Sequence, residues 1–230
     1  MATFVLIHGS GDGGWAWHLV QRALEERGHR AVAPDLPTDD DAATWADCAE
    51  VVRAAAGDAP GPVLVGHSSG GQVVPLAAEA CGASLQVFVA GLVPRPGETP
   101  EQWFAAVGWA EAVARARRAD GGLTGHPDPR VAYYHDVPAD LAAEALARER
   151  PTGDRLGRTP WPLAELPAVP ARFVVTALDR FLPPAVQRRV AADRLCIPEP
   201  DAIEAGHCVG LSRPDELAGL LARYADTALT

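Results

Sequence analysis

The segment Gly66-His67-Ser68-Ser69-Gly70 lies between the apolar run Pro62–His67 and a helical pattern over residues 69–81. A serine on such a strand-to-helix turn has a strained backbone, and the glycines two residues before and after it prevent collisions with neighbouring backbone. Free N–H groups at the start of the helix favour negative charge beside the serine. The segment therefore predicts a nucleophile at Ser68, and the alternative interpretation is a glycine-rich turn that only ends a strand.

The same alternation of short apolar runs and helical patterns extends in both directions from this segment. The expected strands are Thr3–His8, Arg30–Ala33, Pro62–His67, Leu85–Ala90, Arg172–Ala177 and a short region at Leu195–Ile197 and Ala202–Glu204. The expected helices are 15–27, 42–56, 69–81, 184–192 and 213–225. Repeated strand–helix units feed parallel sheets, so we expect an α/β fold with a mostly parallel six-stranded sheet and helices on both faces.

The alternation stops between residues 94 and 170, where proline, glycine and aromatic residues are frequent and one clear helix is expected at 139–149. Linkers lack aromatic side chains that need burial. We therefore interpret this segment as a lid inserted into a single domain of residues 1–230, whose core comprises residues 1–93 and 171–230.

A serine hydroxyl needs a base, and the base needs a group that orients it. His207 is the best candidate base because it stands between the last expected strand and the terminal helix. This places it on a loop at the same sheet edge as Ser68. His67 is adjacent to Ser68, but it is expected to point to the other side of the turn and to be structural.

The orienting acid is expected at Asp179, which directly follows an expected strand. Active sites of open parallel sheets lie at the carboxyl ends of strands. Glu204 and Asp201 are alternatives because they are close to His207 in the sequence. The order Ser68, Asp179, His207, with each residue after a strand, favours a catalytic interpretation.

A glycine-rich loop, HGSGDGGW at residues 8–15, follows the first expected strand. Its spacing fits the dinucleotide pattern GxGxxG, and Asp35 stands where a ribose-binding acid would be expected. However, Asp12 lies where a pyrophosphate would bind. The alternative role is an oxyanion hole, in which the backbone N–H groups of Ser10 and Ser69 converge on a carbonyl oxygen attacked by Ser68.

Composition excludes several other functions. The chain of 230 residues has a formal net charge of −10, which disfavours binding to nucleic acids and to anionic membranes. Lysine is absent, so Schiff-base chemistry is excluded. The four cysteines form no CxxC pair, and neither an export signal nor a membrane-length apolar run is apparent. We expect a cytoplasmic monomer or homodimer that needs no metal and no organic cofactor.

The aromatic side chains suggest an apolar substrate pocket. The residues expected to line it are Trp15, Trp103, Trp109, Tyr133 and Trp161, together with Cys208 beside the candidate base. The alternative for each aromatic residue is that it packs the lid onto the sheet, where burial stabilises by ~2 kcal/mol irrespective of function.

Four segments give the chain a resemblance to the α/β-hydrolase superfamily over nearly its whole length. They are FVLIHGSGDGGWAW (4–17), GHSSGG (66–71), ALDRFLP (177–183) and EAGHCVGLSRPDELA (204–218). The greatest likeness is to the compact methylesterase and hydroxynitrile-lyase branch. This resemblance implies a nucleophile at Ser68, an acid at Asp179, a base at His207 and oxyanion donors at Ser10 and Ser69.

The resemblance also limits which reactions of this branch are expected. The lyases of this branch have threonine and lysine where this chain has Gly9 and Cys208, which disfavours cyanohydrin cleavage. The segment Tyr133–Asp136 is more similar to bacterial relatives than to the plant esterases. We expect hydrolysis of a small to medium, apolar or aromatic carboxylic ester through an acyl-enzyme. The alternatives are a cyclase, dehydratase or carbon–carbon lyase on the same scaffold, or a ligand-binding receptor with a vestigial triad.

Overall fold

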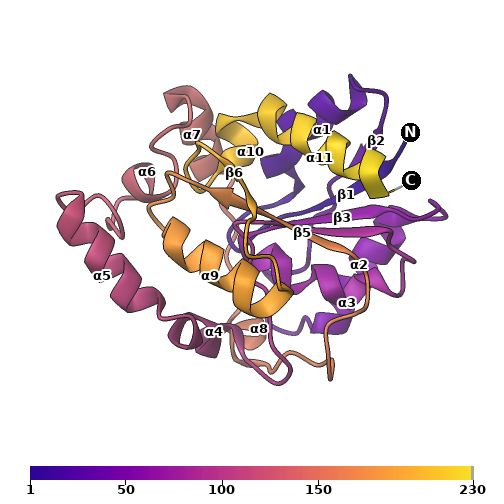
Figure 1. Ribbon diagram of the computed structural model, residues 1–230, viewed down its shortest axis with the longest axis horizontal. Helices are drawn as coiled ribbons and strands as arrows, with labels where there is room; N and C mark the ends of the chain where they lie inside the picture. Colours follow the sequence, from indigo (N-terminus) through magenta and orange to yellow (C-terminus); the bar gives the residue numbers. More distant parts are fainter. Residues whose placement is uncertain (229–230) are drawn as a thin grey trace.

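The computed structural model describes residues 1–228 and contains one six-stranded sheet in the order β2-β1-β3-β4-β5-β6 (Figure 1). The strands are β1 (Thr3–Ile7), β2 (Arg30–Val32), β3 (Val63–His67), β4 (Leu85–Val89), β5 (Ala171–Thr176) and β6 (Asp201–Ile203). Every neighbouring pair is parallel. All carboxyl ends therefore lie at one edge of the sheet, where the loops carrying Ser68, Asp179 and His207 emerge.

Helices cover both faces of this sheet, as the sequence predicts. Helices α1 (His18–Glu25) and α11 (Pro214–Ala228) pack on one face. Helices α2 (Trp45–Ala56), α3 (Val74–Ala78) and α9 (Pro184–Leu195) pack on the other. Two separate apolar clusters result, because side chains alternate between the two faces of each strand. Both faces of the central strands are buried, which explains their almost continuous apolar sequences.

The segment between β4 and β5 contains more helix than the single one expected at 139–149. Its elements are α4 (Pro100–Ala106), α5 (Trp109–Ala119), α6 (Pro129–Ala132), α7 (Ala139–Ala147) and α8 (Asp154–Arg158). Local caps explain the early helices, since Thr99 and Gln102 form a capping box at the start of α4. Figure 1 shows these helices at the opposite side of the molecule from the two termini.

Three expected elements differ from the structure. Leu195–Ile197 is not a strand: Leu195 ends α9, and Cys196 follows in the left-handed conformation with φ of 56°. The expected helix 15–27 begins with the 3-10 helix η1 (Gly14–Trp17). The expected helix 69–81 divides into the 3-10 helix η2 (Ser68–Gln72) and α3, because Pro75 lacks the N–H that a continuous helix requires.

Within residues 1–228, no helix combines the length and the apolar character needed to cross a bilayer.

Candidate active site

Ser68 directly follows β3 and begins η2. Its φ is 51°, in the left-handed region that residues other than glycine rarely adopt. A Cβ at Gly66 would lie 2.7 Å from the Gly70 carbonyl oxygen, and a Cβ at Gly70 would lie 2.6 Å from the Ile7 carbonyl oxygen. Both positions therefore require glycine. The structure thus has the strained strand-to-helix turn that the sequence predicts.

The Asp179 carboxylate is buried just beyond the end of β5 and accepts hydrogen bonds on both oxygens. Oδ1 accepts from the backbone N–H groups of Phe181 and Leu182, both at 2.8 Å. Oδ2 accepts from the Thr176 hydroxyl at 2.8 Å and the Gln187 amide at 3.0 Å. Burial alone would raise the pKa of Asp179, but His207 and these donors hold this pKa below its usual value.

His207 lies on the loop between β6 and α10 (Val209–Ser212), and its Nδ1 is 2.7 Å from Asp179 Oδ2. Because Asp179 is an ionised acceptor, Nδ1 carries the proton and Nε2 is left with a lone pair that can accept one. The alternative acids lie elsewhere: Asp201 accepts from the Tyr224 hydroxyl, and Glu204 is exposed. The acid that contacts the candidate base is therefore Asp179.

His67 packs against His207, with ring centroids 4.7 Å apart. Its Nε2–H donates to the backbone carbonyl of His207 at 2.9 Å. Burial, followed by the nearby His207, lowers the pKa of His67 to about 3, so this ring stays neutral near pH 7. Its contact supports the loop that carries the candidate base, which agrees with the structural role expected for it.

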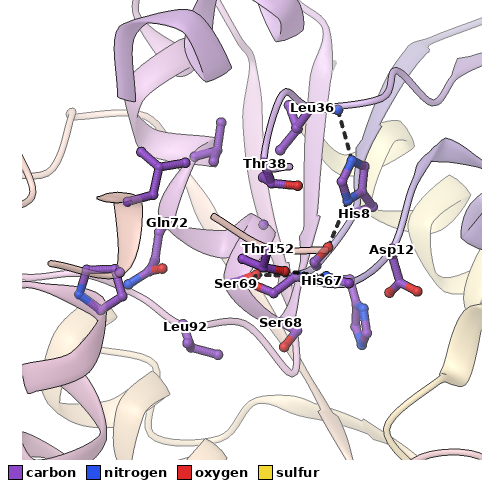
Figure 2. Close-up of a pocket in the computed structure, with 18 of the residues that line it drawn as sticks. His8, Asp12, Leu36, Thr38, His67, Ser68, Ser69, Gln72, Leu92 and Thr152 are labelled. Atoms are coloured by element: carbon purple, nitrogen blue, oxygen red, sulfur yellow. Dashed lines mark hydrogen bonds between the residues drawn. The ribbon is translucent and has the colours of Figure 1, made fainter. Parts of the chain in front are cut away.

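The glycine-rich loop brings Ser10 next to Ser69. The Ser10 N–H donates to Ser69 Oγ at 2.6 Å, and the two hydroxyl oxygens are 2.8 Å apart. The two expected oxyanion donors are therefore neighbours, but the Ser69 side chain already accepts from the Ser10 N–H. Figure 2 shows Ser69 and Ser68 close together on one turn, with His8 above and to the right of them beside Leu36.

The same loop is closed by side chains rather than left open for a nucleotide. Asp35 Oδ1 accepts from the Gly14 N–H at 2.7 Å, so this carboxylate is occupied where a ribose-binding acid was considered. His8 accepts from the Leu36 N–H at 2.9 Å through Nε2, and its Nδ1–H donates to the Gly9 carbonyl at 2.8 Å. Burial lowers the pKa of His8. Sequence reasoning did not assign this role to His8, because the hydrogen bonds join distant segments.

A cavity of about 320 Å³ opens beside Ser68 and His207. Its wall is mostly apolar and includes Leu36, Trp45, Val73, Leu92, Phe104, Tyr133, Tyr134, Leu146, Leu156 and Phe181. Polar side chains on the wall include Ser10, Asp12, Thr38, Gln72, Glu149 and Thr152. A mostly apolar cavity with a few convergent polar groups is the usual form of a small-molecule site.

Of the residues expected in the pocket, Tyr133 and Cys208 line it. Burial raises the pKa of the Cys208 thiol, which keeps it protonated. The other four lie outside the cavity wall. Trp103 and Trp161 are fully buried, and their indole N–H groups donate to the carbonyls of Val93 and Gln72. They attach the segment between β4 and β5 to the core.

The remaining two tryptophans also pack rather than line the cavity. Trp109 donates its indole N–H to the Phe181 carbonyl at 2.8 Å, and the two rings are 5.9 Å apart. Trp15 stacks on His18 at 4.6 Å, and the Arg148 guanidinium lies 4.9 Å from its ring. These contacts correspond to the packing alternative considered for each aromatic residue.

Thr176 and Gln187 are functional candidates that sequence reasoning missed. Both hold Oδ2 of Asp179, and Gln187 also donates to the Thr176 hydroxyl at 2.8 Å. The only sequence signal is the position of Thr176 at the end of β5, three residues before Asp179. Gln187 comes from α9, and only side-chain geometry identifies its role.

Comparison with known proteins identifies the family and agrees with the fold. The model of the alpha/beta hydrolase family matches residues 4–220. The rice protein "Esterase PIR7B" (Oryza sativa subsp. japonica) is 29% identical over 97% of this chain and 95% of its own length. "Norfluorocurarine synthase 1" from Strychnos nux-vomica is 26% identical over 97% of this chain and 95% of its own length. The crystal structure of polyneuridine aldehyde esterase superposes with a TM-score of 0.76 at 22% identity, covering 98% of this chain and 99% of that one. The chain belongs to the alpha/beta hydrolase family.

Proposed function

We propose that the protein hydrolyses a small to medium, apolar or aromatic carboxylic ester, with Ser68 as nucleophile, His207 as general base and Asp179 as the acid that orients it. The observation that carries this proposal is the 2.7 Å contact between His207 Nδ1 and Asp179 Oδ2. That contact leaves Nε2 of His207 able to accept a proton at the cavity that Ser68 also lines. The relatives named as esterases support the same chemistry.

The reaction proceeds in two halves. The Ser68 oxygen bonds to the ester carbonyl carbon as its proton passes to His207 Nε2. The carbon–oxygen bond to the alcohol then breaks, and His207 donates the proton to the leaving oxygen. In the second half a water oxygen bonds to the acyl carbon, its proton passes to His207, and the bond to Ser68 breaks with the proton returned to Ser68. The products are a carboxylic acid and an alcohol.

The oxyanion of each half is stabilised by the backbone N–H groups of Ser10 and Ser69. One such donor typically lowers the barrier by ~3 kcal/mol. Because the Ser10 N–H donates to Ser69 Oγ, the Ser69 side chain must rotate about χ1 before the Ser10 N–H can bind a substrate oxygen. The Ser69 hydroxyl therefore competes with the substrate for this donor.

The relative named as a synthase favours one alternative, a non-hydrolytic reaction on the same scaffold. In that reaction Ser68 only binds the substrate, while His207 moves a proton. A Cβ at residue 9 would lie 3.1 Å from the Ser68 Cβ, so this position is next to the nucleophile. Because residue 9 is glycine, it provides no hydroxyl there, unlike the threonine of the lyases. Cyanohydrin cleavage, which the sequence disfavours, is therefore not proposed.

A panel of p-nitrophenyl and methyl esters tests the proposal. We expect steady turnover by the wild-type protein and its loss in Ser68→Ala, with Asp193→Asn as the control because Asp193 is exposed on α9. Activity on a natural substrate that survives in Ser68→Ala would favour the non-hydrolytic alternative. Tight binding without turnover in the wild type would favour a receptor.

A further inference from the structure

The charges on the cavity wall are all of one sign. Asp12 and Glu149 contribute carboxylates, whereas none of the twenty basic residues of the chain is among the described residues that line the cavity. Of the histidines there, His8 and His67 have lowered pKa values and add no positive charge near pH 7. The Asp179 carboxylate does not line the cavity, and both of its oxygens accept hydrogen bonds. Asp12 and Glu149 form no ion pair with any residue among 1–228.

Asp12 lies on the glycine-rich loop, two residues after the proposed oxyanion donor Ser10. Figure 2 shows it on the same side of the cavity as His67. None of the residues in the described part of the chain donates a hydrogen bond to its carboxylate, in contrast to the five donors around Asp179. Burial and then the charge of Glu149 raise the pKa of Asp12 to about 6, against the opposing effect of His207. Asp12 is thus a half-buried carboxylate that accepts no hydrogen bond from the described residues and lies close to the candidate base.

Glu149 is held next to Asp12 by backbone contacts. The Arg150 N–H donates to the Gly11 carbonyl at 2.9 Å, and the Gly11 N–H donates to the Thr152 hydroxyl at 3.1 Å. The Cβ position of Gly11 lies only 3.8 Å from Glu149 Oε1. These contacts hold the backbone of residues 149–152 beside the loop, where the Glu149 side chain is exposed and its charge acts on Asp12.

The wall around these carboxylates suits an organic cation better than a metal ion. The described residues contain no group of three or more His, Cys, Asp or Glu side chains able to hold a metal. Tyr134 lies near both acids, whose charges add to the effect of burial in raising the pKa of its phenol. An aromatic face beside carboxylates is the usual environment for an ammonium group, which also needs less desolvation than a small hydrated ion.

We propose that Asp12 and Glu149 select ester substrates that carry a cationic amine or quaternary ammonium group on the acyl part, away from the scissile carbonyl. The inference rests on the proposed ester hydrolysis and names its substrate class. A cation between the two acids removes their mutual repulsion, whereas a substrate with a second carboxylate adds to it. Neutral esters are accepted by the apolar wall without this gain.

Three matched p-nitrophenyl esters test the proposal. The first has a trimethylammonio-butanoyl group, the second is its neutral isostere with carbon in place of the quaternary nitrogen, and the third is the glutarate monoester. For the wild type at pH 7.5 we expect kcat/KM to be about tenfold or more higher for the cationic ester than for its isostere. The glutarate monoester should be the poorest substrate. Salt should reduce the preference, because part of the site is open to solvent.

The ratio of kcat/KM for the cationic ester to kcat/KM for its neutral isostere is measured within each variant. A lower fraction of folded enzyme changes both values equally and leaves the ratio unchanged. We expect Asp12→Asn to lower the ratio to within threefold of unity, Glu149→Gln to lower it partly, and Asp193→Asn to leave it unchanged. A wild-type ratio near unity, or an unchanged ratio in Asp12→Asn, would overturn the inference while turnover of the neutral ester upheld the hydrolase. If no ester is turned over, the proposed function fails, and the inference fails with it.

Discussion

Replacing Asp179 with asparagine separates the charge of this residue from its shape. An asparagine that keeps its oxygen toward Phe181 and Leu182 places its NH₂ group where Oδ2 now accepts three hydrogen bonds. The Nδ1–H of His207 would then face another donor. The ring avoids this by moving its proton to Nε2, and in that tautomer His207 cannot take the proton of Ser68.

The magnitude follows from this tautomer change. Where the aspartate of a serine triad becomes asparagine, kcat falls about 10⁴-fold, which corresponds to about 5 kcal/mol. The donors of Thr176 and Gln187 also lose their acceptor, so the free energy of unfolding should fall by about 1–3 kcal/mol. The measurement is kcat for p-nitrophenyl butyrate, with thermal unfolding to verify the fold and Asp193→Asn as the control. A folded Asp179→Asn protein with kcat within tenfold of the wild type would refute the reasoning.

Three further predictions concern other parts of the site. Ser69→Ala removes the hydroxyl that accepts from the Ser10 N–H, so kcat/KM should rise by about threefold to tenfold; a tenfold fall in ester kinetics would contradict this. Gly66→Ala places a Cβ 2.7 Å from the Gly70 carbonyl oxygen and should cost about 3 kcal/mol in chemical denaturation; an unchanged midpoint would contradict the tight turn. The pKa of Asp12 rises on folding from 3.8 to about 6, so the folded state binds its proton more tightly and loses stability as the pH rises through that interval, by up to about 3 kcal/mol. Asp12→Asn should therefore raise the Tm at pH 7.5 but not at pH 3.5, whereas equal shifts at both values would contradict the assignment.

The fold was predictable because its signals are local. Runs such as Val63–His67 are buried on both faces and contain few polar residues. The short run at Leu195–Ile197 is also apolar, but Leu195 is the last residue of α9 and the backbone turns at Cys196. Three apolar residues carry no period that distinguishes a strand from a helix end. Of the helices between β4 and β5, α7 was expected, and α4, α6 and α8 were missed because each has at most seven residues. The missed helix α5 spans 11 residues without proline or glycine, but none of its residues is buried, so it lacks a clear apolar face.

The candidate site was predictable only where function follows position along a strand. Ser68 directly follows β3, and Asp179 lies three residues after the end of β5. This placement, with the glycines on both sides of Ser68, makes them candidates. The pocket wall depends on how side chains pack across distant segments. The sequence therefore does not reveal that Trp103 and Trp161, which were expected in the pocket, are buried in the core.

Covalent labelling of Ser68 tests the central claim most directly. We predict that a fluorophosphonate adds one adduct to the intact mass of the wild-type protein, that peptide mapping locates it on Ser68, and that Ser68→Ala remains unlabelled. His207→Ala should be labelled far more slowly, because the base that activates the hydroxyl is missing. A wild-type protein that turns over esters yet takes no label, or an equal adduct on Ser68→Ala, would contradict the account.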